Sequence, residues 1–417
     1  MNCCILHGDY RCAMIQAKIE DKREGKIMET KRVIVTDKEQ VKDEELLEAA
    51  RILKEGGLVA FPTETVYGLG ANALDEQAAK KIYAAKGRPS DNPLIAHISD
   101  IKELIPLVKE IPEAGKKLME AYWPGPLTMI FNKSDLVPYG TTGGLDTVAV
   151  RMPSDKVANR LIALAGVPIA APSANTSGRP SPTTADHVWK DMNGKIEMIV
   201  DGGPVGIGVE STIVDVTEEI PVILRPGAIT MEMLKGLLGD VRIDPAIVGP
   251  MKPDMRPKAP GMKYRHYAPK ADMTLVELSD ETKQALEDKN GSFYRSVMHR
   301  ISDCAKDIHI GAEDYLLSWE VKRLAEEAAE QGLKVGVICT DETKEEYEWE
   351  RSNIFIVRSM GLRAREETVA HNLYAVLREF DDLEVDFIVA EGFARTQLGQ
   401  AIMNRLTKAA GHKVVKI

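Results

Sequence analysis

The sequence predicts an α/β protein made of two successive domains, the second of them Rossmann-like. Its 417 residues are enough for two or three domains at roughly 100–200 residues each. Short apolar runs alternate with amphipathic segments along most of the chain, and residues 245–270, which contain six prolines, interrupt this alternation. We therefore expect an extended connector at 245–270, between a first domain at 35–244 and a second domain at 271–417.

Helices and strands are expected to alternate in the first domain. Residues 42–55 carry leucine and alanine at helical spacing and are followed by Gly56, which is typical of the end of an amphipathic helix. A second helix should run from Asp75, a favourable N-cap, to Ala85 and stop at Gly87. The expected strands are short apolar runs at residues 57–61, 94–98, 127–131, 148–151, 169–171, 196–200 and 212–216.

The second domain continues the alternation over residues 271–417. Its strands are expected at residues 273–278, 335–338, 387–389 and 414–417. Its helices are expected at residues 321–331, 363–380 and 397–410. This order favours a parallel, Rossmann-like sheet, but the domain has no GxGxxG fingerprint, so the sheet need not bind a dinucleotide.

Charge and composition exclude several classes of protein. The 54 Lys and Arg residues against 64 Asp and Glu give a formal charge of −10, which excludes a globally basic coat protein for nucleic acid. No apolar run reaches the roughly 18 residues of a membrane span. Five cysteines are too few for a disulfide scaffold in a chain of this length. These features predict a cytoplasmic protein with no membrane partner.

The first 34 residues are expected to be a disordered leader outside the fold. Residues 1–27 lack the apolar core of a signal peptide and end in a charged run before Met28, a candidate start of the native chain. Cys3, Cys4 and Cys12 lack the CxxC spacing of a zinc site. We predict no protein-held metal site from the sequence.

Common signatures of phosphate binding and covalent catalysis are missing from the chain. It has no GxxxxGK[ST] phosphate loop, no GxSxG elbow and no HExxH zinc motif. Nucleotide chemistry would therefore need side-chain contacts with phosphate in a different arrangement of loops.

Two segments in the first domain place polar or cationic side chains at strand or helix ends. Residues 61–70 (FPTETVYGLG) run from an apolar strand into hydroxyl groups and glycines, which suits either a ligand loop or a tight turn. Lys86 and Arg88 suit a polyphosphate, although a solvated helix end has the same composition. Asn92 can hydrogen-bond a base or a sugar, whereas a lone strand histidine such as His97 is more often a satisfied core residue.

Two later segments are also rich in polar groups or glycine. In residues 201–215, glycines allow a close approach of the backbone to a ligand. Arg225 lies at a strand end, where it could bind phosphate or form a surface ion pair. Residues 170–181 (AAPSANTSGRPS) form either a plain loop or a cradle for phosphate or ribose, built from small polar side chains: Ser173, Asn175, Thr176, Ser177 and Ser181.

The connector is more than a plain spacer in composition. Residues 252–270 contain six Lys or Arg and one Asp, so they are locally basic in an acidic protein. The connector ends in PGMKYRHYAP, with two tyrosines and a histidine. We expect it to link the domains and also to touch a ligand as a lid.

Taken together, in this order and spacing, the four segments resemble the YrdC-like domain of the threonylcarbamoyl-AMP synthase family. The Lys-x-Arg and Ser-x-Asn signature of that family is matched by Lys86, Arg88, Ser173 and Asn175. The resemblance covers about residues 35–240, and the connector and second domain resemble the long, two-domain form. It implies a YrdC-like α/β domain with a twisted mixed sheet, followed by the Rossmann-like domain.

The resemblance also implies an activity, that of a nucleotidyltransferase. In that family L-threonine, bicarbonate or CO₂, and ATP give threonylcarbamoyl-adenylate and pyrophosphate, with Mg²⁺ on the leaving pyrophosphate. A separate transferase complex then moves the threonylcarbamoyl group to an adenosine beside the anticodon of tRNA. No protein nucleophile is required, which fits the missing signatures of covalent catalysis.

Site residues follow from matching the family's motifs to this sequence. The expected catalytic residues are Lys86, Arg88, Ser173 and Asn175. The expected ATP contacts are Lys86, Arg88, Asn92, Ser173, Asn175, Ser181, Arg225 and Tyr267, with His266 near the nucleotide and one further contact within residues 147–151. The expected threonine contacts are Thr65, His97, Ala171 through its backbone, and Ser211.

Two other functions stay open at this point. A similar domain occurs in carbamoyl-adenylate chemistry of hydrogenase maturation, but that larger protein carries zinc-finger motifs, and this chain has no CxxC pair. An RNA-binding or ribosome-assembly module is the second alternative, because Lys80, Lys81, Lys86 and Arg88 form a local basic cluster. Whether the protein touches tRNA directly is left open by the sequence.

Overall fold

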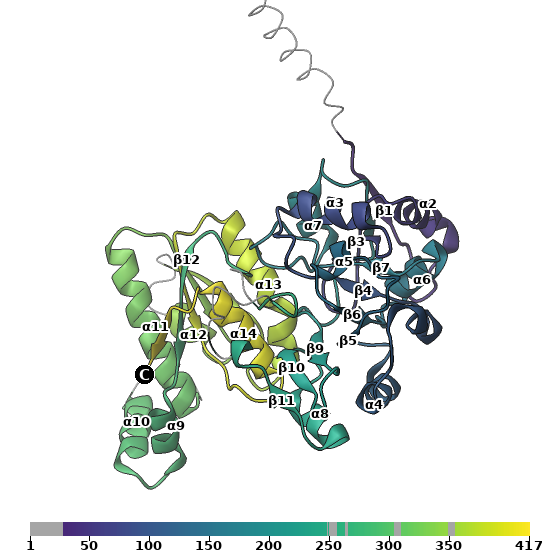
Figure 1. Ribbon diagram of the computed structural model, residues 1–417. Coiled ribbons are helices and arrows are strands. Elements are labelled where there is room, and N and C mark those ends of the chain that lie inside the picture. The colour runs from purple at the N-terminus through teal and green to yellow at the C-terminus, as the bar shows by residue number, and fades with distance from the viewer. Residues whose placement is uncertain (1–27, 248, 250–256, 263–265, 304–309, 349–354) are drawn as a thin grey trace, which may run out of the picture.

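The computed structural model describes residues 28–247, 249, 257–262, 266–303, 310–348 and 355–417. In this part of the chain two sheets lie side by side, one from the N-terminal half and one from the C-terminal half (Figure 1). The α/β fold expected from the sequence is confirmed, with a mixed sheet first and a parallel sheet second. Residues 1–27 of the expected leader and part of the connector lie outside the described residues.

The first sheet is mixed in strand direction. β1 and β8 pair in parallel, for example, whereas β2 and β3 pair antiparallel. In spatial order its strands are β1 (Lys31–Ile34), β8 (Met198–Asp201), β2 (Val59–Phe61), β3 (Gly68–Asn72), β7 (Ile169–Ala170), β4 (Ile95–His97), β6 (Thr147–Arg151), β5 (Leu127–Asn132), β9 (Thr212–Asp215), β10 (Val222–Arg225) and β11 (Arg242–Ile243). Because β2, β3, β7 and β4 are neighbours in this order, the polar segments that flank them converge.

Helix α3 (Glu76–Lys86) shows how local sequence places a predicted site residue. The Asp75 side chain accepts a hydrogen bond from the backbone N–H of Gln77, as expected of an N-cap. Gly87 has φ of 63° and ends the helix, so Lys86 occupies its last turn. The other α-helices described in this half are α2 (Asp43–Lys54), α4 (Glu113–Tyr122), α5 (Tyr139–Thr142), α6 (Lys156–Ala165), α7 (Ala185–Met192) and α8 (Met231–Leu238).

In the first sheet, β1, β3 and the two-residue β11 were not among the expected strands. The expected disordered leader, residues 1–34, is wrong at its C-terminal end, because residues 31–34 form β1, which pairs with β8. Its side chains are mostly exposed, so the apolar pattern of a core strand is absent. β3 was expected to be a loop because of its glycines. A Cβ on Gly70 would lie 2.7 Å from the Phe61 ring and 2.8 Å from Ile169, so glycine is what allows β3 to pack there.

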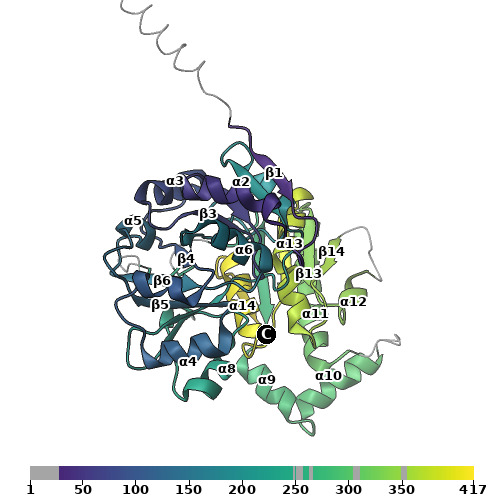
Figure 2. The ribbon, with the colours of Figure 1, turned by 90° about the vertical axis from the view of Figure 1, so that its right-hand side faces the viewer.

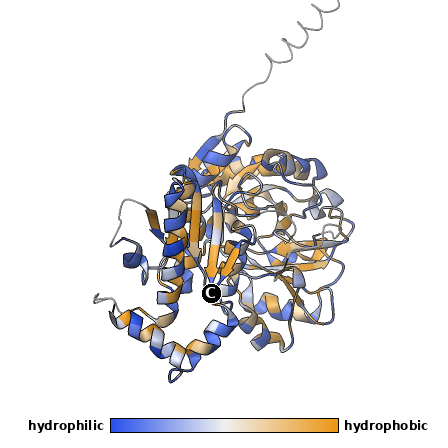
Figure 3. Ribbon diagram, turned by 90° about the vertical axis from the view of Figure 1, so that its left-hand side faces the viewer, coloured by the Kyte–Doolittle hydropathy of each residue, from blue (hydrophilic) through white to orange (hydrophobic). Residues whose placement is uncertain are grey.

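The second sheet is parallel throughout, as expected for a Rossmann-like domain. In spatial order its strands are β14 (Phe355–Ser359), β13 (Val335–Cys339), β15 (Phe387–Glu391), β12 (Asp272–Glu277) and β16 (Val414–Lys416). Figure 3 shows these strands as an apolar layer behind helices that are hydrophilic on their outer side. β14 was not expected, because it is an edge strand whose short apolar run contains an arginine.

The helices of the second domain divide between the two faces of its sheet. α13 (Glu366–Asp382) and α14 (Gly399–Ala409) cover the face toward the first domain, and α11 (Ala312–Glu330) covers the other (Figures 1 and 2). The remaining α-helices described there are α9 (Asp280–Glu287), α10 (Ser292–Asp303) and α12 (Lys344–Glu348). No helix in the described ranges is both long and apolar enough to cross a bilayer.

The two domains share part of their core. Val66 and Val209 of the first domain and Tyr267 of the connector belong to the same buried cluster as Leu373 on α13 and Met403 on α14. The apolar core of the second domain therefore continues into the loops of the first.

Candidate active site

A pocket of about 550 Å³ lies among the loops that flank the central strands of the first sheet, and the connector forms part of its wall. Of the twelve residues that the sequence analysis assigned to substrates, eight line it: Thr65, Arg88, His97, Ala171, Ser173, Ser211, Arg225 and Tyr267. Four are buried outside its lining: Lys86, Asn92, Asn175 and Ser181.

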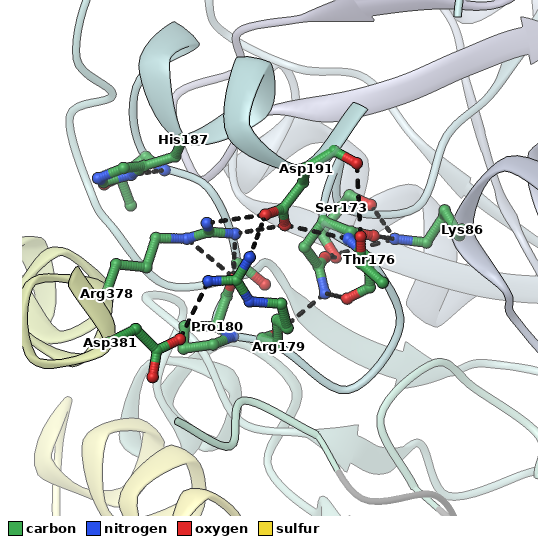
Figure 4. A network of polar contacts seen from close by, with 12 residues as sticks. Lys86, Ser173, Thr176, Arg179, Pro180, His187, Asp191, Arg378 and Asp381 are labelled. Carbon is green, nitrogen blue, oxygen red and sulfur yellow. Dashed lines mark hydrogen bonds and ion pairs between the residues drawn. The ribbon is translucent and has the colours of Figure 1, made fainter. Parts of the chain in front are cut away.

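Lys86 holds the loop that follows β7 (Figure 4). Its Nζ donates to the backbone oxygens of Ser173 and Asn175, each at 2.5 Å, and to Asn175 Oδ1 at 3.4 Å. Asn175 Oδ1 also accepts a hydrogen bond from Ser173 Oγ at 2.5 Å. Burial, and then the charge of Arg88, lowers the pKa of Lys86 well below its ordinary value. These three residues thus form one unit in which the ammonium group contacts loop oxygens.

Arg88, the remaining residue of the family signature, lines the pocket itself. Its Nε donates to the backbone oxygen of Asn92 at 3.3 Å, and its Nη2 donates to that of Pro93 at 3.1 Å. Burial lowers the pKa of Arg88 to about 10, which still leaves the guanidinium charged at pH 7. Because carbonyl oxygens do not neutralise it, Arg88 presents positive charge to an anionic ligand.

One part of the pocket is lined by hydroxyl groups and an uncharged histidine. Thr65 Oγ1 accepts a hydrogen bond from Arg151 Nη1 at 2.9 Å, and Arg151 also forms a 2.8 Å ion pair with Glu64. His97 Nδ1 lies 3.0 Å from the backbone oxygen of Ile95. Burial, and then the charge of Arg151, lowers the pKa of His97 to about 3, so the ring is neutral at pH 7. This part suits a small polar ligand.

Ser211 and Arg225 are bonded to each other in the pocket wall. Arg225 donates through Nε to the backbone oxygen of Ser211 at 3.0 Å and through Nη2 to Ser211 Oγ at 3.1 Å. Ser211 Oγ also lies 2.7 Å from Thr128 Oγ1 on β5. Both residues are buried. The Arg225 guanidinium is thereby fixed at the pocket, beside a serine that also lines it.

Glu210 is the acidic residue among the described pocket lining. Its Oε1 accepts from Ser181 Oγ at 2.5 Å, and the Tyr374 hydroxyl lies 3.0 and 2.9 Å from its two oxygens. Arg405 Nε donates to Oε2 at 3.0 Å. Burial opposes ionisation of Glu210, but Arg405 and Arg225 outweigh burial and hold its pKa below the ordinary value. Ser181, which does not line the pocket, is therefore linked to it through Glu210.

The described part of the connector closes one side of the pocket. Lys408 Nζ on α14 donates to the backbone oxygen of Gly261 at 2.6 Å, and the Tyr267 ring stacks at 5.3 Å on the ring of Tyr374. Nε2 of His266 is buried at the pocket without a hydrogen-bond partner among the described residues. The connector is thus held by the second domain while it faces the site of the first.

A buried ionic cluster ties the Lys86 loop to helix α13 (Figure 4). Asp191, on α7, accepts a hydrogen bond from the backbone N–H of Thr176 at 3.0 Å. It also pairs with Arg378 at 2.8 Å and with Arg179 at 2.7 Å. The second domain thereby anchors the loop that carries the Ser-x-Asn signature.

Sequence reasoning missed Glu210 and the three side chains that reach the site from the second domain: Tyr374, Arg378 and Arg405. A signal existed for the two arginines, because each lies among apolar residues at helical spacing. Such a charge is seldom buried without a partner. Nothing in the sequence pattern identified the partner, which lies more than 180 positions away in each case.

The mixed sheet, its arginine-lined pocket and the parallel-sheet domain behind it define a two-domain enzyme of the nucleotidyltransferase type. Residues 51–227 match the family model described as "Telomere recombination". Residues 229–411 match the model described as "Threonylcarbamoyl-AMP synthase, C-terminal domain". The chain belongs to the threonylcarbamoyl-AMP synthase family, in its long, two-domain form.

Full-length relatives and solved structures agree with this assignment. The threonylcarbamoyl-AMP synthase of Bacillus subtilis (strain 168) is 46% identical over 392 residues, which cover 93% of this chain and 100% of that protein. The threonylcarbamoyl-AMP synthase of Pyrococcus abyssi is 45% identical over 386 residues, 92% and 99% of the two chains. The structure of P. abyssi Sua5 with L-threonine is 44% identical with a TM-score of 0.76, covering 93% of this chain and 99% of that one.

Proposed function

We propose that this chain makes threonylcarbamoyl-adenylate and pyrophosphate from L-threonine, bicarbonate or CO₂, and ATP. The observation that carries the proposal is that one pocket has a neutral part and a cationic part in its lining. A neutral part contains Thr65 and His97, and a cationic part contains Arg88 and Arg225. An amino acid and a polyphosphate need these two environments side by side. The Sua5 structure with L-threonine supports the first half of this pairing.

The two substrates are assigned to the two parts of the wall. L-Threonine would contact Thr65, His97, Ser211 and the backbone of Ala171. The nucleotide would contact Arg88, Ser173, Arg225 and Tyr267, which line the same pocket. We assign Lys86 and Asn175 to positioning of Ser173, Asn92 to positioning of Arg88, and Ser181 to positioning of Glu210, because their contacts are with those residues.

The reaction requires positioning and charge stabilisation rather than a protein nucleophile. The threonine amine adds to CO₂ and loses a proton, which forms a carbamate. A carbamate oxygen then attacks the α-phosphorus of ATP, the bond between the α- and β-phosphates breaks, and pyrophosphate leaves. Arg88 and Arg225 would stabilise the negative charge that develops on the phosphates.

Mg²⁺ is expected to accompany ATP, and the described residues offer no cage for it. No group of three or more His, Cys, Asp or Glu in the described residues could hold a metal ion. The pocket carboxylate, Glu210, is engaged by Ser181, Tyr374 and Arg405. Such a cage is not required, because Mg²⁺ usually keeps several waters and binds the phosphate oxygens of the nucleotide.

The product is a mixed anhydride that water destroys, so a second protein must use it promptly. We assign that role to a transferase complex that modifies an adenosine beside the anticodon of tRNA. We also propose a cytoplasmic location, where this partner, ATP and threonine would be supplied.

The proposal is tested by the release of pyrophosphate from ATP, with threonine and bicarbonate added singly and together. We expect release only when both are present, and the adenylate should be identified by mass spectrometry. Arg88→Met should abolish release, whereas Lys80→Met should not, because Lys80 is exposed on α3, does not line the pocket and pairs with Glu76. Folded protein that releases no pyrophosphate under these conditions would contradict the proposal and return weight to RNA binding.

A further inference from the structure

Glu210 places a carboxylate in the wall of a pocket that we propose holds the polyanionic phosphates of ATP. The pocket would hold the polyphosphate of ATP, and Arg88 and Arg225 supply the positive charge for it. Glu210 lines the same wall, is buried, and has a pKa that keeps it ionised. An unpaired anion there would oppose nucleotide binding, because buried charges are only weakly screened.

The second domain supplies the partner that compensates this charge. Arg405, on α14, is fully buried with 0% of its side chain exposed. Its Nε donates to Glu210 Oε2 at 3.0 Å, its Nη2 to the backbone oxygen of Glu210 at 3.2 Å, and its Nη1 to that of Pro226 at 2.5 Å. Tyr374 on α13 adds a hydroxyl donor to both carboxylate oxygens.

These contacts lie on either side of the bonded pair Ser211 and Arg225 in the pocket wall. Glu210 precedes Ser211, and Pro226 follows Arg225, so Arg405 bonds to the chain on both sides of the Ser211–Arg225 contact. The guanidinium also lies 5.9 Å from the centre of the Tyr267 ring. Arg405 thus contacts the loop before β9, the loop after β10 and the connector at once.

We propose that Arg405 is a positioning residue whose main effect is to mask the charge of Glu210, so that the second domain completes the ATP site without touching ATP. The inference rests on the proposed function, since it names the nucleotide as the ligand of this wall. It explains why a domain that contributes no lining residue to the described pocket beyond the connector is nevertheless bonded to it by a buried arginine.

Two roles of Arg405 must be separated, because it contacts both a charge and the backbone. If masking of the Glu210 charge dominates, the ATP affinity lost with Arg405 is restored when the charge of Glu210 is also removed. If clamping of the backbone dominates, a second substitution at Glu210 cannot help, since the bonds to Glu210 O and Pro226 O remain lost.

The experiment measures the dissociation constant of ATP directly, by equilibrium titration of the full-length protein, together with the KM for threonine. We expect Arg405→Met to weaken ATP binding about tenfold or more while the threonine KM changes far less. The double variant with Glu210→Gln should bind ATP at least about fivefold more tightly than Arg405→Met alone. A double variant no better than the single variant would overturn the masking role.

Arg405→Lys keeps the charge but loses the fork of donors, so it remains informative if Arg405→Met does not fold. Masking predicts ATP binding within about threefold of wild type, and clamping predicts a loss close to that of Arg405→Met. Arg395→Met is the control, because Arg395 is paired with Glu277 in the same domain and does not line the pocket. The titration needs no turnover, so a wild-type protein that binds ATP but makes no adenylate would contradict the proposed function and leave this test intact.

Discussion

The ammonium group of Lys86 bonds both the backbone oxygen and the side-chain oxygen of Asn175, at 2.5 and 3.4 Å. Lys86 is the last residue of α3, and Asn175 lies in the loop after β7, so the contact joins segments far apart in the chain. Because Ser173 O takes a third bond, the donors of the ammonium group are directed at the loop. Lys86 therefore fixes where Ser173 stands in the pocket.

Replacement of Lys86 by methionine is expected to damage both the loop and the reaction. Three loop oxygens lose their donor, and we expect kcat/KM to fall by about 10²–10³ together with the melting temperature. Arg88→Met should lower ATP affinity with a smaller change in melting temperature, because Arg88 contacts only two carbonyl oxygens. Steady-state kinetics and thermal unfolding of both variants test these expectations. A Lys86→Met protein of full activity would refute the positioning role of Lys86.

Breaking the Arg378–Asp191 pair should destabilise the contact between the domains. Both side chains are buried, so Arg378→Met leaves a carboxylate without its main partner and should cost about 3–5 kcal/mol. Lys190→Met removes the exposed Lys190–Asp382 pair from the same interface and should cost at most about 1 kcal/mol. Denaturant unfolding of the two variants side by side measures the difference, and equal costs would contradict the anchoring role of Asp191.

Gly208 should tolerate no side chain, because its loop packs directly on α13. It has φ of 90°, and an added Cβ would lie 2.5 Å from the backbone oxygen of Ala370. Gly194 has φ of 78° with no atom closer than 3.9 Å, so Gly194→Ala reports the backbone strain alone, about 1–2 kcal/mol. Gly208→Ala should lower the melting temperature clearly more than Gly194→Ala, and similar shifts would mean that the loop can move away from α13.

The neutral state of His97 should make stability depend on pH. Its pKa is lowered to about 3 in the folded protein, against about 6.5 when unfolded, so the unfolded chain binds the extra proton between these values. The contribution is fully present above pH 6.5 and is lost as pH falls, by about 2 kcal/mol at pH 5. Unfolding of wild type and His97→Gln at pH 7.5 and 5.0 should show a smaller loss for the variant; identical losses would mean that His97 is not held neutral.

Much of the fold could be predicted because its signals are local. Apolar runs marked most strands of both sheets, and the N-cap Asp75 with Gly87 marked the ends of α3. β1 and β14 escaped prediction because edge strands bury little and carry charged residues. β3 escaped because its glycines are required by close packing against Phe61, which appears only in the folded protein.

The site was predictable only as a set of motifs. Strand ends and the family signature identified residues that the structure brings to one pocket, such as Arg88 and Ser211. They could not separate Ser173, which lines the pocket, from Lys86, which stands behind it. The pairing of Glu210 with Arg405 spans 195 positions, and no local pattern carries such information.

The Glu210–Arg405 pair can form only late in synthesis of the chain. N-terminal domains generally fold first as they leave the ribosome, so the first sheet and its pocket loops can form early. Arg405 follows in the chain every strand of both sheets except β16. Until that late segment emerges, Glu210 lacks its arginine partner, and Val66 and Val209 lack part of the surface that covers them. In a nascent or truncated chain the proposed ATP site would therefore be incomplete, and we expect nucleotide to be used only after the whole molecule has assembled.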